Sequence, residues 1–272
     1  MKRLIFICLF IFSISGCSSQ ANPVPIPAVS TLEAANPLPD SRPVIRLTSG
    51  EWRPYTGENL PDFGCDSRIV AGVFSHLGYT VEFGFFPWAR GFHLAETGEW
   101  DGTFEWADTL ETRQAFFVSR DPISEQAFVF FHKIDHPFDW EKKEDLAGRI
   151  IGVTSGYLYS GLFDDIRNDP DFIFQEASTD EANFEKLLAG RIDVFPMEIN
   201  VGLSLIREKF TAGQVSQLTY HKKPLSVFEP YVFLTKKNPA NEKLMQQFDT
   251  AFEFFVKSGE LQRFTDSCDL EK

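Results

Sequence analysis

LAETGEWDGTFE (residues 94–105) and LAGRIDVFPME (residues 188–198) repeat one pattern in this chain. In each stretch a helical run ends at a glycine, a short strand follows, and a carboxylate, Glu105 or Glu198, stands at the end. Helix, glycine and strand in this order are typical of α/β sheets. Ligands of such sheets bind beyond the carboxyl ends of the strands, so Glu105 and Glu198 are expected at the mouth of a cleft. The alternative is that both are solvated loop residues.

Strands and helices alternate around both stretches. The first series predicts strands at 44–48, 81–85 and 102–104, and helices at 66–77 and 89–96. The second series predicts strands at 149–153, 172–174 and 192–195, and helices at 159–167 and 179–188. Each series is therefore expected to build a mainly parallel sheet flanked by helices.

Two apolar strands, 127–131 and 231–234, connect the two series. One runs out of the first series and the other runs back after the second, as a double hinge requires. The sequence thus predicts an α/β fold of two lobes. Lobe 1 is expected from residues 44–127 and 231–272, and lobe 2 from residues 128–230.

The N-terminus predicts export. Lys2 and Arg3 precede an apolar run over 4–14, which is shorter than the roughly 20 residues of a membrane-spanning helix but fits a signal peptide. Ser15-Gly16-Cys17 follows and resembles the lipobox of bacterial lipoproteins. Residues 1–16 are expected to be cleaved, Cys17 to carry lipid, and the proline-rich segment 17–43 to act as a tether. An ordinary secretory signal, with Cys17 incidental, is the alternative.

The chain is acidic, with a net charge of −13. This charge argues against nucleic acid or anionic lipid as the partner and suits a cationic ligand. We expect a monomer in the periplasm, anchored by lipid to the inner or the outer membrane.

The chain has four cysteines. Cys8 leaves with the signal peptide and Cys17 carries lipid, so Cys65 and Cys268 remain as an even pair in an oxidising compartment. A disulfide between Cys65 and Cys268 is expected, and two separately buried thiols are the alternative.

Short motifs along residues 44–264 are similar to those of the periplasmic solute-binding proteins of the amino-acid-binding type (family 3), the receptors of ABC importers. The markers are Trp52-Arg53-Pro54-Tyr55, Gly78-Tyr79, Pro87-Trp88-Ala89-Arg90, Gly98-Glu99-Trp100-Asp101-Gly102, Thr109-Leu110-Glu111-Thr112-Arg113, Gly152-Val153-Thr154-Ser155-Gly156 and Gly190-Arg191-Ile192-Asp193. The resemblance implies a two-lobed periplasmic-binding-protein fold of type II that closes on a small ligand. It also implies a membrane permease as partner.

The resemblance implies roles for particular residues. Trp52 and Trp88 stand where aromatic rings contact the ligand, and Arg113 stands where an arginine pairs with the ligand carboxylate. A planar guanidinium suits that task because it donates two parallel hydrogen bonds. Glu198 stands where an acid holds the ligand ammonium. The alternatives are that Arg113 pairs only with Asp108 or Glu111, and that each tryptophan belongs to the core.

The chain departs from the family where small hydroxyl residues are expected. Before Arg113 it has Glu105, Trp106 and Asp108, and after Gly156 it has Tyr157 and Leu158. These acids and aromatic rings suit an amine or another cation. The expected ligand-binding set is therefore Trp52, Trp88, Arg90, Glu105, Trp106, Asp108, Arg113, Tyr157 and Glu198.

No sequence motif for enzymatic chemistry occurs in the chain. His132, Asp135 and His136 could hold a metal, but His-x-x-x-His outside a helix is more often surface decoration, so no metal or other cofactor is expected. We expect a binding protein and not an enzyme. One alternative is a periplasmic cyclohexadienyl or arogenate dehydratase with Glu198 as general acid. The other is the ligand-sensing subunit of a membrane receptor.

Overall fold

A computed structural model describes residues 42–265 of the chain, apart from 156, 158, 160 and 168. The expected signal peptide, the lipidated Cys17, the tether before Arg42, and Cys268 lie outside the described residues. Within the described residues, no helix combines the length and apolarity that a membrane span needs.

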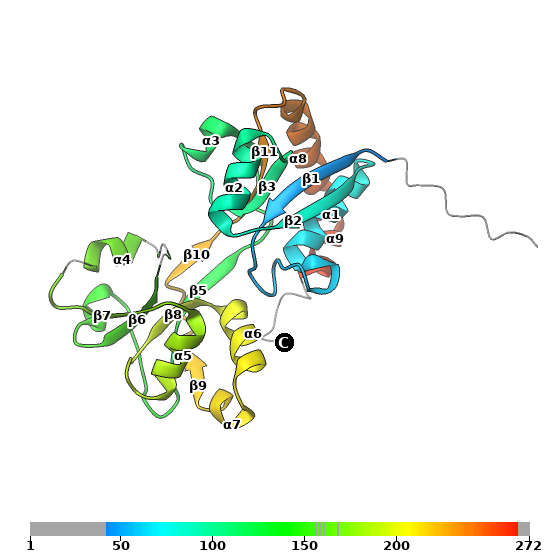
Figure 1. The fold of residues 1–272 in the computed structure, drawn as a ribbon. Helices are drawn as coiled ribbons and strands as arrows, with labels where there is room; N and C mark the ends of the chain where they lie inside the picture. The colour runs from blue at the N-terminus through cyan, green and yellow to red at the C-terminus, as the bar shows by residue number, and fades with distance from the viewer. Residues whose placement is uncertain (1–41, 156, 158, 160, 168, 266–272) are drawn as a thin grey trace, which may run out of the picture. The chain divides into compact units, whose positions relative to one another are not determined.

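The first sheet has the strand order β2-β1-β3-β11-β4. The three parallel strands are the expected ones. β11 extends the sheet by pairing antiparallel with β3, and β4 pairs antiparallel with β11. In chain order the strands are β1 (Val44–Ser49), β2 (Thr80–Phe85), β3 (Gly102–Trp106), β4 (Phe116–Val118) and β11 (Tyr231–Thr235). The helices and turn of this lobe are η1 (Pro61–Phe63), α1 (Cys65–His76), α2 (Trp88–Thr97), α3 (Thr112–Ala115), α8 (Ala240–Ser258) and α9 (Glu260–Thr265). Figure 1 shows them around the sheet.

The second lobe is built on β5, which pairs antiparallel with three strands, and on a parallel pair of β6 and β7. The strands are β5 (Gln126–Lys133), β6 (Ile150–Thr154), β7 (Ile173–Ala177), β8 (Phe195–Glu198), β9 (Leu218–Tyr220) and β10 (Ser226–Phe228). Its helices and turn are η2 (Lys143–Leu146), α4 (Gly161–Ile166), α5 (Asp180–Leu188), α6 (Ile199–Lys209) and α7 (Ala212–Val215). A parallel bridge between Ile151 and Val194 ties β6 to the residues before β8.

The chain passes between the sheets twice, from β4 to β5 and from β10 to β11 (Figure 1). Both crossings coincide with the apolar strands that the sequence predicts as connectors. The expected double hinge is therefore present. The lobe limits of 44–127 with 231–272, and of 128–230, stay a proposal.

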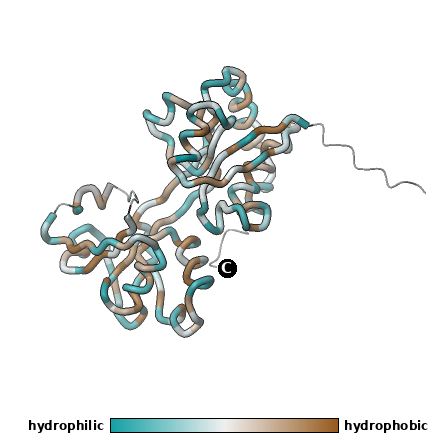
Figure 2. The backbone as a smooth tube through the Cα atoms, viewed as in Figure 1, coloured by the Kyte–Doolittle hydropathy of each residue, from teal (hydrophilic) through white to brown (hydrophobic). Residues whose placement is uncertain are grey.

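Apolar periodicity explains the first helix. Ile69, Val70, Val73 and Phe74 recur at helical spacing, and all four are fully buried under the first sheet. Figure 2 shows hydrophobic stretches inside both lobes and hydrophilic stretches in many of the outer turns.

One expected strand differs from the observed one. The strand expected over 192–195 begins only at Phe195 and runs to Glu198. The residues before it are held by Asp193, whose backbone N–H donates to the Ile150 carbonyl (2.8 Å) and whose carboxylate accepts from the Ile150 N–H (2.7 Å). Because a side chain replaces part of the ladder there, regular pairing starts later. Glu198 is thus the last residue of a strand.

Candidate functional site

The segment between β1 and α1 belongs to the first lobe and packs the aromatic side chains of Trp52 and Tyr55 against the second lobe. A tight turn forms after β1, in which the Tyr55 and Thr56 N–H groups donate to the Trp52 carbonyl (2.8 and 3.0 Å). Tyr55 is 3 % exposed and packs in the core cluster of the second lobe with Val129 and Val201. This segment is therefore a point of contact between the lobes.

Glu198 is the residue of the second lobe to which Tyr55 is hydrogen bonded. It caps α6, because its carboxylate accepts from the Val201 N–H at 2.7 Å, and its other oxygen accepts from the Tyr55 hydroxyl at 2.9 Å. Burial is the main cause that raises the pKa of Glu198 to about 7, while the hydrogen bonds from Val201 and Tyr55 act against that rise. Glu198 is 1 % exposed, and both of its oxygens have protein donors, so its contact with a ligand stays a prediction.

Glu105 lies inside β3, with only 5 % of its surface exposed and its backbone at φ +70°. A non-glycine residue at positive φ costs about 1 kcal/mol or more, and such strain gathers at functional sites. Its carboxyl group is hydrogen bonded to that of Asp66, the second residue of α1, which is fully buried. Burial is the first cause, and the charge of Asp66 the second, that raises the pKa of Glu105 well above its usual range.

Gln126 connects this acid pair to an aromatic ring. Its Nε2 donates to Glu105 Oε2 (2.9 Å), and its Oε1 accepts from the Trp52 indole N–H (2.9 Å). Gln126 is the first residue of β5, so it stands where the chain crosses between the lobes. Ser124, in the same crossing, donates to Asp66 Oδ2 at 2.6 Å.

Trp52 also meets rings of the second lobe. It lies edge-on to Tyr157, with ring centroids 6.2 Å apart, and stacks near Phe128 at 6.4 Å. The Tyr157 hydroxyl donates to Asp180 (2.8 Å), which also accepts from Thr154 (2.6 Å). Burial, followed by the charge of Asp180, raises the pKa of Tyr157. Tyr157 is thus a neutral donor held in place by an acid.

Trp88 and Trp106 form a second aromatic pair, in the first lobe. Their rings are perpendicular, with centroids 5.5 Å apart, and the Trp106 indole donates to Thr103 Oγ1 (3.0 Å). The Trp88 ring covers Gly50, where an added Cβ would lie 2.4 Å from a ring carbon. Gly50 directly follows β1, so Trp88 lies against the start of the segment that carries Trp52.

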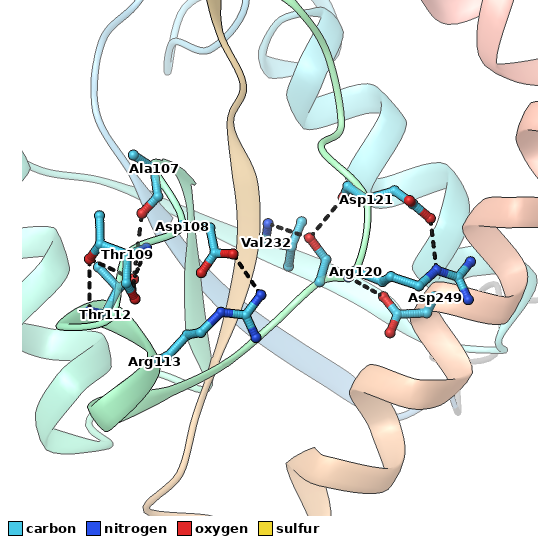
Figure 3. Close-up of polar contacts among 10 residues, drawn as sticks. Ala107, Asp108, Thr109, Thr112, Arg113, Arg120, Asp121, Val232 and Asp249 are labelled. Atoms are coloured by element: carbon cyan, nitrogen blue, oxygen red, sulfur yellow. Dashed lines mark hydrogen bonds and ion pairs between the residues drawn. The ribbon is translucent and has the colours of Figure 1, made fainter. Parts of the chain in front are cut away.

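The two arginines of the expected site have other partners. Arg113 donates to Asp108 Oδ2 at 2.6 Å, which is the pairing that the sequence left open (Figure 3). Its side chain is 53 % exposed, so a contact with a ligand carboxylate stays a prediction. Arg90 is exposed, and its guanidinium lies 5.5 Å from the centre of the Phe86 ring.

The structure brings part of the expected set together. Trp52 contacts the Tyr157 ring directly and is linked to Glu105 through Gln126. Glu198 is hydrogen bonded to Tyr55, which lies in the same segment as Trp52. Sequence reasoning missed Tyr55, Asp66, Gln126 and Asp180 as residues that hold the expected side chains in place. The position of Asp66 at the start of α1 was the one signal that could have suggested more.

No group of three or more His, Cys, Asp and Glu side chains with a metal-binding arrangement occurs among the residues that the structure describes. His132 is 8 % exposed, and its Nδ1 lies 2.9 Å from the Lys133 carbonyl. Cys65 is disulfide-bonded. Its pairing with Cys268 stays a prediction.

No model of a known protein family and no curated protein matches the chain. Solved structures do match. An ancestral arginine-binding protein bound to arginine is 20 % identical, with a TM-score of 0.63 over 83 % of this chain and 98 % of that one. An amino acid ABC transporter substrate-binding protein from Streptococcus pneumoniae, bound to L-arginine, is 15 % identical, with a TM-score of 0.62 over 83 % and 94 %.

A histidine kinase sensor domain with similarity to periplasmic binding proteins is 18 % identical, with a TM-score of 0.64 over 84 % of this chain and 96 % of that one. Likenesses at such identities establish the fold. The chain has the two-lobed periplasmic-binding-protein fold that its motifs predict.

Proposed function

We propose that this protein is an extracytoplasmic solute-binding protein that captures one small polar metabolite by closing its two lobes. The observation that carries the proposal is the meeting of Trp52, from the first lobe, with Tyr157, from the second, beside the crossing that contains Gln126. A ligand that contacts side chains of both lobes stabilises the closed arrangement of the hinge.

The side chains favour an amino acid or a related amine as the ligand. Glu105, Asp108 and Glu198 bring carboxyl groups, and aromatic rings suited to cation–π contact stand beside them. Glu105 and Glu198 are buried and hydrogen bonded within the protein, so Asp108 is the acid of this set that can pair with a cation by charge. Arg113 is the candidate partner for a carboxylate on the same ligand. Arginine is the bound ligand named for two of the structural neighbours, which supports this class.

The proposal extends to the cellular setting. Lipidation of Cys17 and the proline-rich tether would hold the protein on a membrane that faces the periplasm, as a monomer. A permease of an ABC importer would then recognise the closed form. Among the structural neighbours there are also amino acid ABC transporter proteins, which supports this partner.

Ligand binding is expected to stabilise the folded protein. A ligand at about 100 times its dissociation constant adds roughly 2.7 kcal/mol to the free energy of unfolding. This is expected to raise the melting temperature by about 5 to 10 °C for a body of this size. We would record melting temperature with L-arginine, L-citrulline, agmatine, polyamines, betaines and prephenate, after unfolding and refolding to remove bound ligand.

Three compounds of that panel, L-arginine, L-citrulline and agmatine, distinguish which charged group of the ligand the site recognises. L-Citrulline lacks the positive charge of the L-arginine side chain, and agmatine lacks its carboxylate. Stabilisation by L-arginine and agmatine but not by L-citrulline would support a cationic subsite. No shift with any compound, from protein shown to be refolded, would contradict the proposed function.

Arg113 offers a matched test of the carboxylate contact. Arg113 and Arg120 are both 53 % exposed and each pairs with an acid, Asp108 or Asp121 (Figure 3). If Arg113 binds the ligand carboxylate, Arg113→Ala should weaken binding of a carboxylate-bearing ligand by about tenfold to a hundredfold, the value of a charge-assisted hydrogen bond. Arg120→Ala should leave the dissociation constant within about twofold. Equal effects in isothermal titration calorimetry would show that Arg113 has no direct role.

Two other functions use the same fold. A sensory role, in which a membrane receptor recognises the closed form, is favoured by the likeness to a histidine kinase sensor domain. A dehydratase would need Glu198 as a proton donor to substrate, but both Glu198 oxygens already have protein donors. Formation of phenylpyruvate from prephenate would favour the dehydratase over a binding protein.

A further inference from the structure

Gln126 links a candidate ligand-stacking ring to a buried acid pair through one amide group. The amide oxygen accepts from the Trp52 indole at 2.9 Å. The amide nitrogen donates to Glu105 Oε2 at 2.9 Å and to Asp66 Oδ2 at 3.4 Å. Gln126 itself is fully buried, so water does not compete for these bonds.

The hydrogen bonds locate a proton within the acid pair. Asp66 Oδ2 accepts from both Ser124 and Gln126, so that oxygen carries no proton. Glu105 Oε1 is buried and accepts no hydrogen bond from any residue in the described part of the chain. Two adjacent buried carboxyl groups cannot both ionise without a large cost. A single proton shared between the carboxyl groups of Glu105 and Asp66 satisfies both groups.

We propose that Gln126 is a positioning residue of the cleft, which couples the orientation of the Trp52 indole to the proton shared by Glu105 and Asp66. When Glu105 loses that proton, its charge attracts the Gln126 NH2 group more strongly and repels Asp66. The amide then shifts, and the indole that it holds shifts with it. This inference rests on the proposed function only for the role of Trp52 as a ligand contact.

The titratable groups around the pair come from three elements and a loop. From α1 there is Asp66, from β3 Glu105, from the end of β8 Glu198, and from the segment after β1 Tyr55. The charges of Asp66 and Glu198 both raise the pKa of Glu105, and Asp66 also raises the pKa of Glu198 and Tyr55. On the other side of Trp52, the Tyr157 ring leads to Asp180, whose pKa is also raised by burial. Glu198 and Asp180 are therefore the acids whose titration has to be separated from that of the pair.

The test follows indole N–H resonances by NMR in the ligand-free, full-length protein. Trp52→Phe identifies the Trp52 signal. We expect this signal to move in a pH titration from mildly acidic to alkaline conditions, because burial and the charge of Asp66 raise the pKa of Glu105 above its usual range. Glu105→Gln, which keeps the shape of the protonated acid, should abolish the movement. Gln126→Leu should displace the signal and also make it independent of pH.

Three controls make the result specific. The Trp106 indole donates to a hydroxyl that does not titrate in this range, so its signal should stay in place. Glu198→Gln and Asp180→Asn should each leave the Trp52 movement intact. A Trp52 signal that is constant in the wild type, that moves equally in Glu105→Gln, or that stops moving in Glu198→Gln or Asp180→Asn would overturn the proposal. Because no ligand is used, such a result would leave the proposed function untouched.

Discussion

Replacing Glu198 with glutamine is expected to remove a pH dependence worth about 3 kcal/mol of unfolding free energy between about pH 4 and about pH 8. Burial raises the pKa of Glu198 in the folded protein to about 7, against an ordinary value of 4.5. The folded state therefore binds this proton more tightly than the unfolded state. Its contribution to stability is complete below about pH 4.5, falls as pH rises, and is gone above about pH 7.

The measurement is urea unfolding of the wild type and of Glu198→Gln at several pH values. The stability difference between the two proteins should shift by about 3 kcal/mol in favour of the variant on going from acid to alkaline pH. The control is Glu185→Gln on the exposed face of α5, which should follow the wild type at every pH. Parallel curves for wild type and Glu198→Gln would show that Glu198 is not buried between the lobes.

Gly64→Ala is expected to destabilise the protein by about 3 kcal/mol or more and to disturb the segment that holds Trp52 and Tyr55. Gly64 has φ +98°, and a Cβ there would lie 2.3 Å from the Tyr55 carbonyl oxygen. That carbonyl accepts from the Asp66 N–H at 3.0 Å, so it cannot move without disturbing the start of α1. The substitution thus combines an unfavourable backbone conformation with a clash against backbone atoms.

Gly78→Ala separates these two effects. Gly78 has φ +84°, but a Cβ there meets nothing within 4 Å. This variant should lose only about 1 kcal/mol, the cost of the backbone conformation. The midpoints of urea unfolding would be compared at equal slopes. If the free energy of unfolding falls equally in both variants, the close approach of Gly64 to Tyr55 does not contribute to the destabilisation.

Local patterns predicted the elements well where one face of a helix or strand is buried. Ile69, Val73 and Phe74 mark α1 by their spacing alone, and Gly98 ends α2 in the left-handed conformation that glycine favours. The helix α6 was not predicted, although its buried face includes Val201 and Ile206, and neither were the short strands β4, β9 and β10. These strands form because a neighbouring strand offers backbone partners, and no pattern of three residues reports that.

The candidate site, like the fold, could be predicted from the sequence only in part. That Glu105 and Glu198 stand at strand ends, and that Trp52 follows the first strand, is evident from sequence order. The partners of these side chains are not, because they lie far away along the chain. Tyr55 contacts Glu198 across 143 residues of sequence, and Trp52 contacts Gln126 across 74.

The sequence by itself determined the two-lobed α/β fold, its double hinge and the elements that bear the aromatic and acidic side chains, because periodicity and chain order are local properties. Only the tertiary structure decided which charges are buried and what each one contacts. It paired Arg113 with Asp108, and it placed Asp66 against Glu105 at the hinge. The physical reason is that burial and hydrogen bonding depend on distances between residues that are remote in sequence, and folding alone sets those distances.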